Sequence, residues 1–125
     1  MCLFTKDSEP LISTENITCY KVLEVRGDEL VSPYQKYPFI IGKELTDTVS
    51  PNPQDVFEYW MIEEGYFHSF THPSHAEAIL PVLKRRNKKA EYKIFEAIIP
   101  KGTQYHNGQQ NVDICSKTLK IIKEV

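Results

Sequence analysis

The sequence has few cysteines and no paired cysteine spacing. Cys2, Cys19 and Cys115 form an odd set of three, and none belongs to a C-x-x-C motif. Structural zinc sites use such pairs, and disulfide frameworks use an even number of cysteines. Because the N-terminus has no apolar run of the kind an export signal needs, we interpret the three as reduced thiols. We therefore expect a cytoplasmic protein.

Long hydrophobic runs and an excess of basic residues are also absent. The apolar runs span only a few residues, so we expect no bilayer-spanning segment and no membrane partner. The net charge is −2, which gives no overall field that attracts nucleic acid. The five cations between Lys84 and Lys89 suit the negative end of a preceding helix, and no RNA-binding aromatic motif accompanies them. Nucleic acid is therefore not an expected partner.

What remains is the composition of an ordinary globular domain. The chain has 125 residues, of which 41% are hydrophobic and 26% charged, and this is enough to bury a core without disulfides or metals. We expect a single domain over residues 1–125. Residues 1–16 are polar, and we expect them to be irregular.

Local patterns predict an α+β fold. Apolar and β-branched residues favour strands over residues 17–25, 65–70, 91–100 and 112–125. Asn107-Gly108 is typical of a tight hairpin turn. Prolines exclude regular helix from residues 32–55, which we interpret as loop apart from a short extended segment near Phe39. We expect about five or six strands in a small, mostly antiparallel sheet, with one or two helices packed on it.

Three of the four histidines surround the junction between a predicted strand and a predicted helix. Pro73 suits the first turn of that helix, with Thr71 or His72 as its N-cap, and Ser74 followed by Glu77 offers an alternative start. Pro81 predicts a kink or a restart. His68, His72 and His75 lie close enough in sequence to suggest a metal site. However, Pro73 separates the last two, and no obvious carboxylate completes a ligand set. We therefore expect no metal.

Side chains for nucleophilic catalysis are not grouped by any motif. There is no G-x-S-x-G elbow and no glycine-rich phosphate loop. Ser69 follows His68, but neighbouring strand residues point to opposite faces. A tyrosine offers an apolar ring and a polar tip, which suits binding. The candidate binding surface is Tyr34, Tyr37, Tyr66, His68 and Tyr105.

The order of several short segments resembles a known group of proteins. The segments are "YKVL", "SPYQKYPFIIGK", "GYFHSFTHPSHAEAI", "EAIIPKGTQYHNG" and "CSKTLKI". Together they look like an uncharacterised family of small bacterial and phage domains, over most of residues 20–122. The resemblance implies that "GYFHSF" is a strand running into a helix. It implies no activity.

Shorter segments resemble the ADP-ribosyltransferases. "ITCYKV", "HSFT" and "FEAIIPKGT" are similar to three strand motifs of that fold. The resemblance implies that Lys21 binds the NAD phosphates, that Ser69 or Thr71 positions the nicotinamide ribose, and that Glu96 stabilises the transition state. Lys21 stands where those enzymes have arginine, and Ile94 stands where they have a second Glu or Gln.

The sequence therefore suggests two functions. The prediction is a non-catalytic binding or interaction module, without a cofactor, whose partner is a protein or a small molecule. The alternative is an NAD-using, ADP-ribosyltransferase-like enzyme. The enzyme needs Lys21 and Glu96 in one NAD-sized cleft, whereas the module needs only its tyrosine-rich surface. Since Lys21 lacks the two-pronged grip of arginine on phosphate, we expect no meaningful transfer of ADP-ribose.

Overall fold

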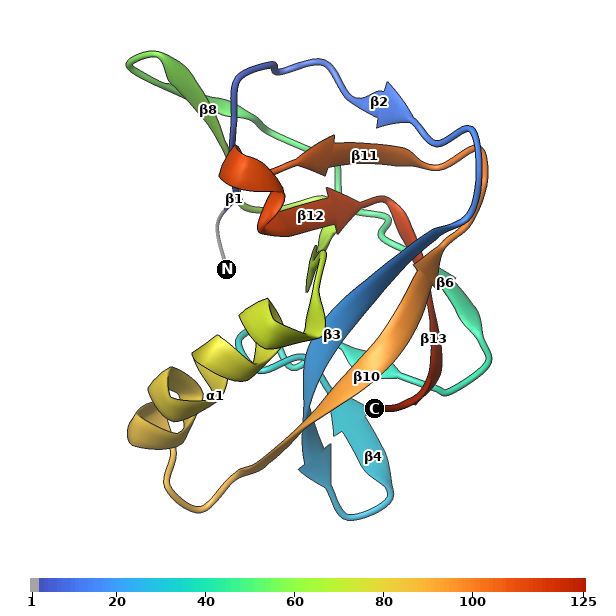
Figure 1. Cartoon of the computed structure of the whole chain (residues 1–125), viewed down its shortest axis with the longest axis vertical. Helices are drawn as coiled ribbons and strands as arrows, with labels where there is room; N and C mark the ends of the chain where they lie inside the picture. The colour runs from blue at the N-terminus through green and yellow to red at the C-terminus, as the bar shows by residue number, and fades with distance from the viewer. Residues whose placement is uncertain (1–2) are drawn as a thin grey trace.

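Strands dominate the structure, which is a computed structural model that describes residues 3–125. They take 47% of the residues, against 14% for helices. Figure 1 shows the long strands β3 (Ile17–Arg26) and β10 (Glu91–Ile99) side by side, with helix α1 (Pro73–Arg86) beside them. The predicted α+β class is wrong, because the described residues form thirteen strands and one α-helix.

The strands form two antiparallel sheets. The remaining strands are β1 (Leu3–Thr5), β2 (Leu11–Ile12), β4 (Glu29–Val31), β5 (Pro38–Phe39), β6 (Glu44–Thr46), β7 (Gln54–Val56), β8 (Tyr59–Ile62), β9 (Phe67–Phe70), β11 (Gln104–Asn107), β12 (Asp113–Ser116) and β13 (Thr118–Glu124). The large sheet has the order β2-β11-β12-β9-β3-β10-β13-β6, and β4 and β5 branch from β3. The small sheet has the order β1-β8-β7. Its β7–β8 hairpin protrudes from the body of the molecule (Figure 1).

Strands are present within residues 91–100 and 112–125, as expected, and they pair with each other. β10 pairs with β13 in antiparallel register, so "IFEAII" and "LKII" lie in one sheet. β10 also pairs along its whole length with β3 without a register shift, from Glu91 opposite Val25 to Ile99 opposite Ile17. The aromatic and β-branched residues of both strands favour this extended pairing.

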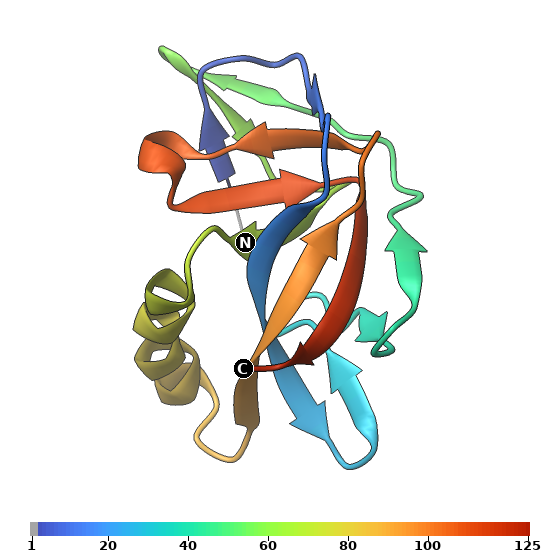
Figure 2. The same ribbon diagram turned by 45° about the vertical axis from the view of Figure 1, so that its right-hand side comes forward.

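The large sheet is bent, and apolar side chains fill both of its faces. Figure 2 shows β11 and β12 running across the top of the upright β3 and β10. The main cluster lies inside this bend and includes Leu23, Phe39, Phe67, Phe95 and Ile121. A second cluster joins the small sheet to β12 through Leu3, Ile62, Tyr66 and Cys115. A third lies under the helix and includes Val22, Phe70, Ala76 and Leu83.

Helix α1 begins as its sequence predicts. His72 is the N-cap and accepts a hydrogen bond from the Ser74 amide, and Pro73 lies in the first turn. An apolar stripe of the helix packs on the sheet through Ala76, Ile79, Leu80 and Leu83. The helix continues through Pro81 as one element rather than restarting. No helix among residues 3–125 is long and apolar enough to cross a bilayer.

Short strands account for the error in fold class. Strands β4 to β8 lie between residues 29 and 62, and each has only two to four residues. Such runs are too short to show a period-two pattern, and the prolines among them favour a loop interpretation. Residues 3–12, expected to be irregular, contribute β1 and β2, while residues 1 and 2 lie outside the described part of the chain.

Two glycines lie where an added Cβ would meet a neighbouring residue. Gly65 precedes β9 with φ +87°, and a Cβ there would lie 2.7 Å from Pro51 Cα. Gly108 has an ordinary φ of −75°, but a Cβ there would lie 1.7 Å from Asp113 Oδ1. The β11–β12 hairpin that Asn107-Gly108 predicts is present. Its connection is longer than a tight turn, because it contains the 3₁₀ turn η1 (Gln109–Asn111).

Candidate functional site

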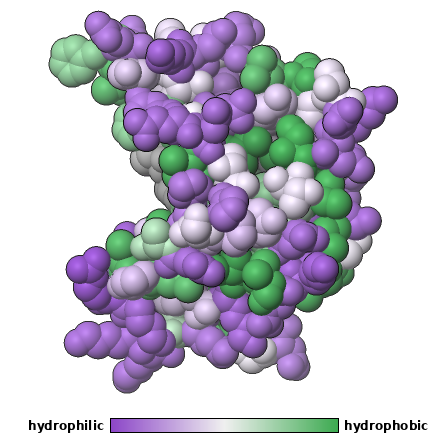
Figure 3. Space-filling view, viewed as in Figure 1, coloured by the Kyte–Doolittle hydropathy of each residue, from purple (hydrophilic) through white to green (hydrophobic). Residues whose placement is uncertain are grey.

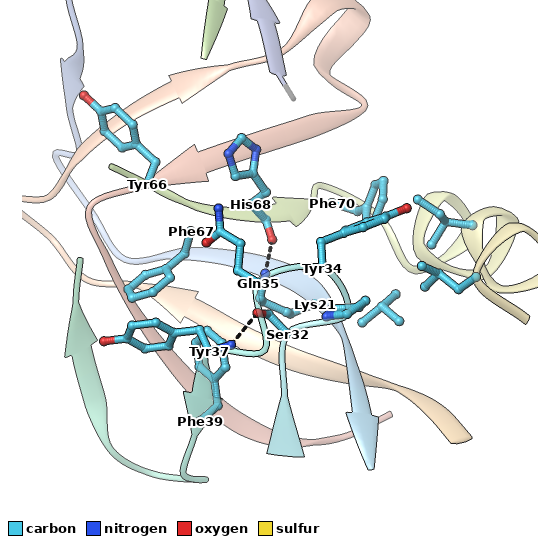
Figure 4. Close-up of a pocket in the computed structure, with 14 residues that line it drawn as sticks. Lys21, Ser32, Tyr34, Gln35, Tyr37, Phe39, Tyr66, Phe67, His68 and Phe70 are labelled. Carbon is cyan, nitrogen blue, oxygen red and sulfur yellow. Dashed lines mark hydrogen bonds between the residues drawn. The ribbon is translucent and has the colours of Figure 1, made fainter. Parts of the chain in front are cut away.

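A pocket lies where β9 separates from β3. The two strands pair at a single position, Tyr20 opposite Phe70, and beyond it they diverge. The loop of residues 32–37 borders this gap, and Ile79 and Leu83 of α1 complete the wall. Figure 4 shows this arrangement, which we call the Lys21 pocket. Its cavity volume is about 50 Å³, enough for a few water-sized groups but not for a dinucleotide.

Lys21 places a buried ammonium group in this pocket. The residue is 6% exposed, and its Nζ donates a hydrogen bond of 2.5 Å to the His68 carbonyl oxygen (Figure 4). It also lies 5.5 Å from the centre of the Phe39 ring. Because β9 has left β3 at this point, the His68 carbonyl needs a donor that the sheet does not supply. Lys21 supplies that donor.

The charge of Lys21 is not balanced by a carboxylate. No Asp or Glu among residues 3–125 forms an ion pair with it. Burial lowers the pKa of Lys21 to about 8, against a smaller opposite effect of the Cys19 thiol. An ammonium group has three donors, and the described residues accept a hydrogen bond from it at one position only. The group is therefore mostly charged at neutral pH and only partly satisfied.

The loop of residues 32–37 is closed by its own hydrogen bonds. The Tyr37 amide donates to Ser32 Oγ at 2.8 Å, and the Ser32 amide donates to the Tyr37 carbonyl at 2.9 Å. Lys36 has a left-handed φ of 57°, which turns the chain within the loop. These contacts fix the loop residues that face the pocket.

A buried carboxylate ties this loop to β3. Lys36 Nζ lies 2.7 Å from Glu24 Oε1, and Arg26 pairs with the other carboxylate oxygen. The Glu24 side chain is 3% exposed, because its two cations cover it rather than a deep layer of protein. The hydrogen bond from Lys36 is the main reason why the pKa of Glu24 is lowered. On the other side, Arg86 of α1 lies 4.9 Å from the Tyr34 ring.

Four of the five predicted binding residues line the Lys21 pocket. Tyr34 and Tyr37 come from the loop, and Tyr66 and His68 come from the segment of β9. Figure 4 shows that the His68 carbonyl points towards Lys21 while its ring lies on the other side of the strand. Tyr105 lies on β11 and packs against the main apolar cluster instead. It is not part of the pocket.

The residues proposed for NAD chemistry do not share one cleft. Phe95 pairs with Lys21 and Glu96 pairs with Tyr20, so Lys21 and Glu96 project from opposite faces of the sheet. Ser69 is 1% exposed and lies close to Cys19, whose thiol pKa is raised to about 11 by burial. The Thr71 hydroxyl donates to backbone carbonyls before β12.

The histidines fall into two separate groups. The His72 and His75 rings meet edge to face at the helix start, with ring centres 6.1 Å apart. His68, Cys115 and His106 form a row across three adjacent strands. No group of three His, Cys, Asp or Glu residues among residues 3–125 is placed to hold a metal ion. The absence of a metal site remains a prediction.

His68 is a buried and incompletely bonded imidazole. Neither ring nitrogen makes a hydrogen bond of ordinary geometry with residues 3–125. Burial, followed by the Lys21 charge, lowers the pKa of His68 to about 3, against a weaker opposite effect of the Glu63 backbone. The ring is therefore neutral near pH 7.

Sequence reasoning missed Glu24 and the role of the loop. Glu24 and Lys36 are twelve residues apart, and no local pattern indicates such a pair. The sequence resemblance indicates Lys21 as a phosphate ligand rather than as a buried amine. A charged residue in the middle of an apolar strand is the signal that could have identified it.

Comparison with known proteins gives no further guide to this site. No protein family, curated protein or solved structure matches the chain. The resemblances to the bacterial and phage domains and to the ADP-ribosyltransferases therefore remain predictions.

Figure 3 shows the polarity of one side of the molecule. A notch separates the part that carries β11 and β12 from the part that carries α1. Hydrophilic side chains gather at the lower left, where the basic end of α1 lies. The five cations from Lys84 to Lys89 form no ion pair with a carboxylate among residues 3–125. They are exposed, as a solvated helix end would be.

Proposed function

We propose that this chain is a non-catalytic binding module whose Lys21 pocket takes a small ligand with an anionic group. The observation that carries the proposal is the buried ammonium of Lys21, which has one hydrogen-bond acceptor and no carboxylate partner among residues 3–125. A buried charge is costly unless it is paired and hydrogen-bonded. A carboxylate in the pocket would supply both the missing charge and further acceptors.

The walls of the pocket suit a ligand with a small apolar part. The rings of Tyr37, Phe39 and Phe67 lie with their centres 5.2 to 5.6 Å apart. Such a group of aromatic rings offers apolar surface beside the charged nitrogen. Ser32, Gln35 and Tyr34 add polar groups from the loop. Since the cavity is about 50 Å³, short carboxylic acids are the best-sized candidates.

The arrangement gives less support to the NAD-using alternative. Its lysine and its glutamate lie on opposite faces of the sheet, and the pocket beside Lys21 is too small for NAD. An NAD-glycohydrolase assay on the wild type and Glu96→Gln tests it independently. We expect no turnover above background in either protein.

Binding of short carboxylates tests the proposed function. Acetate and propionate are titrated into the wild type, Lys21→Met and Lys101→Met, and chemical shifts of the pocket residues are followed by NMR. Lys101 is exposed and lies outside the pocket, so its variant is a matched control for the loss of one positive charge.

The expected result is saturable binding by the wild type and the control, and none by Lys21→Met. Binding should weaken as the pH rises through about 8, because the ammonium loses its charge there. Equal binding by Lys21→Met, or no saturable shift with either acid, would contradict the proposal.

A further inference from the structure

Lys21 differs from every other lysine of the described chain in its surroundings. It is the one lysine among residues 3–125 that is buried, and the others are half-buried or exposed. Its nitrogen lies at a pocket lined by Tyr34, Tyr37 and Phe39. Lysines that act as nucleophiles towards carbonyl compounds are commonly desolvated in this way.

The hydrogen bond to His68 fixes the direction of this nitrogen. Nζ donates to the His68 carbonyl at 2.5 Å. A neutral amine keeps two N–H donors, so it can retain this bond while its lone pair points elsewhere. No carboxylate among residues 3–125 pairs with Lys21 and holds it in the charged form. The geometry therefore allows the amine to present its lone pair to a molecule in the pocket.

We propose that Lys21 is a reactive amine that forms a reversible imine with a small aldehyde or 2-oxo acid bound in the Lys21 pocket. This rests on the proposed function, because the pocket must first admit a small ligand. A 2-oxo acid carries both a carboxylate, which suits the proposed binding of anions, and a carbonyl group, which the amine can attack.

The reaction requires no oxidant, reductant or cofactor. The lone pair of the Lys21 nitrogen attacks the carbonyl carbon, and the electron pair of the C=O π bond moves to the oxygen. The nitrogen loses a proton and the oxygen gains one, which gives a carbinolamine. Loss of water then leaves a C=N bond between the ligand and Nζ. Addition of water reverses the sequence.

The acidity of Lys21 supports this chemistry. Burial lowers its pKa from 10.5 to about 8. Near neutral pH this increases the fraction of neutral amine by roughly a hundredfold or more over an ordinary lysine. The fraction remains a minority, so the same residue still binds anions in its charged form.

Reductive trapping with pyruvate tests the proposal. The full chain is incubated with pyruvate and cyanoborohydride near neutral pH, and the modified lysines are located by peptide mass spectrometry. We expect one predominant adduct at Lys21, labelled at least about tenfold faster than any other lysine, in line with its larger neutral fraction. Labelling spread over the exposed lysines, or absent from Lys21, would overturn the proposal.

Two variants and a competitor distinguish the possible failures. Lys21→Arg keeps a positive charge but forms no imine of this kind, so the predominant adduct should disappear, whereas Lys101→Arg should leave it unchanged. Acetate should slow the labelling of Lys21 by occupying the same pocket. If acetate binds through Lys21 but pyruvate gives no adduct there, the imine proposal fails and the proposed function stands. If neither binds, the proposed function fails as well.

Discussion

Two regions of β3 bury charge in opposite ways. Towards the loop of residues 32–37, Glu24 is held between Lys36 and Arg26. On the other face, Lys21 has a single carbonyl among residues 3–125 as its acceptor. The His68 ring, on the far side of β9 from Lys21, makes no ordinary hydrogen bond with the same residues. We call the first the loop latch and the second the β3–β9 junction. The latch has the contacts of a structural site. The junction has polar groups without a full set of hydrogen-bond partners among residues 3–125.

This difference predicts two kinds of behaviour. Groups at the β3–β9 junction have pKa values shifted by burial, so their contribution to stability should change strongly with pH. Groups of the loop latch are paired and partly exposed, so changing them should have smaller effects. The predictions below test this contrast from the largest effect to the smallest.

The largest effect is expected for His68 in acid. Its pKa in the folded state, about 3, lies below the ordinary value of 6.5, so the unfolded chain takes up the proton first. The contribution of neutral His68 to the free energy of unfolding is therefore fully present above about pH 6.5, and it is lost as the pH falls towards 3. We expect the wild type to lose about 3 kcal/mol relative to His68→Gln between about pH 7 and pH 4. Urea unfolding of both proteins measures the difference, and parallel pH profiles would contradict a buried neutral imidazole.

A slightly smaller effect is expected for Lys21 in alkali. Its folded-state pKa, about 8, lies below its ordinary 10.5, so the unfolded chain holds the proton more tightly. The cost of burying the charge is present in full below about pH 8 and is relieved as the pH rises to about 10.5. Relative to Lys21→Met, the wild type should gain about 2.5 kcal/mol between about pH 7 and pH 10. The same unfolding assay applies, and a gain below about 1 kcal/mol would show that Lys21 is not desolvated.

Removing the negative charge of the loop latch should lower the stability by a smaller amount. Glu24→Gln removes the charge that binds Lys36 and Arg26, whose side chains are 38% and 51% exposed. Because water can solvate both cations after the change, we expect a loss of about 1–2 kcal/mol at neutral pH. Glu91→Gln, which breaks an exposed contact with Lys93, is the control and should change stability little. A loss of more than about 4 kcal/mol on Glu24→Gln would place the latch among deeply buried ion pairs.

The smallest effect is expected where the loop meets the helix. Tyr34→Leu removes the ring that lies 4.9 Å from Arg86, and such a cation–π contact contributes about 0.5–1 kcal/mol at an exposed site. Hydrogen exchange of the amides in residues 32–37 should increase, while that of β3 and β10 should not. Unchanged exchange in the loop would show that its internal hydrogen bonds are sufficient.

The sequence predicts the long elements of this fold well. β3, β10 and α1 have strong patterns over their whole length, and His72 and Pro73 mark the helix start. The strands between residues 29 and 62 are too short for such patterns. They form because their neighbours in the sheet supply the pairing, and a single sequence does not display those contacts.

The candidate site is also predicted only in part by the sequence. Tyr34, Tyr37, Tyr66 and His68 are predicted as binding residues from their side chains alone, and they line the Lys21 pocket. The position of Lys21 opposite Phe95, which separates it from Glu96, depends on the register of β3 and β10. The hydrogen bond from Lys21 to the His68 carbonyl depends on where β9 leaves β3. Both are properties of strand pairing, so residue type and spacing do not predict them.

The most direct test of the central claim is the pKa of Lys21 with and without a ligand. The Lys21 side chain is assigned by comparison with Lys21→Arg, and its ¹³Cε shift is followed against pH by NMR. We predict a pKa near 8 for the free protein and a clear rise in saturating acetate, because a bound anion stabilises the ammonium form. An ordinary pKa near 10.5 that acetate leaves unchanged would contradict the claim that Lys21 is an unpaired, buried charge available to a ligand.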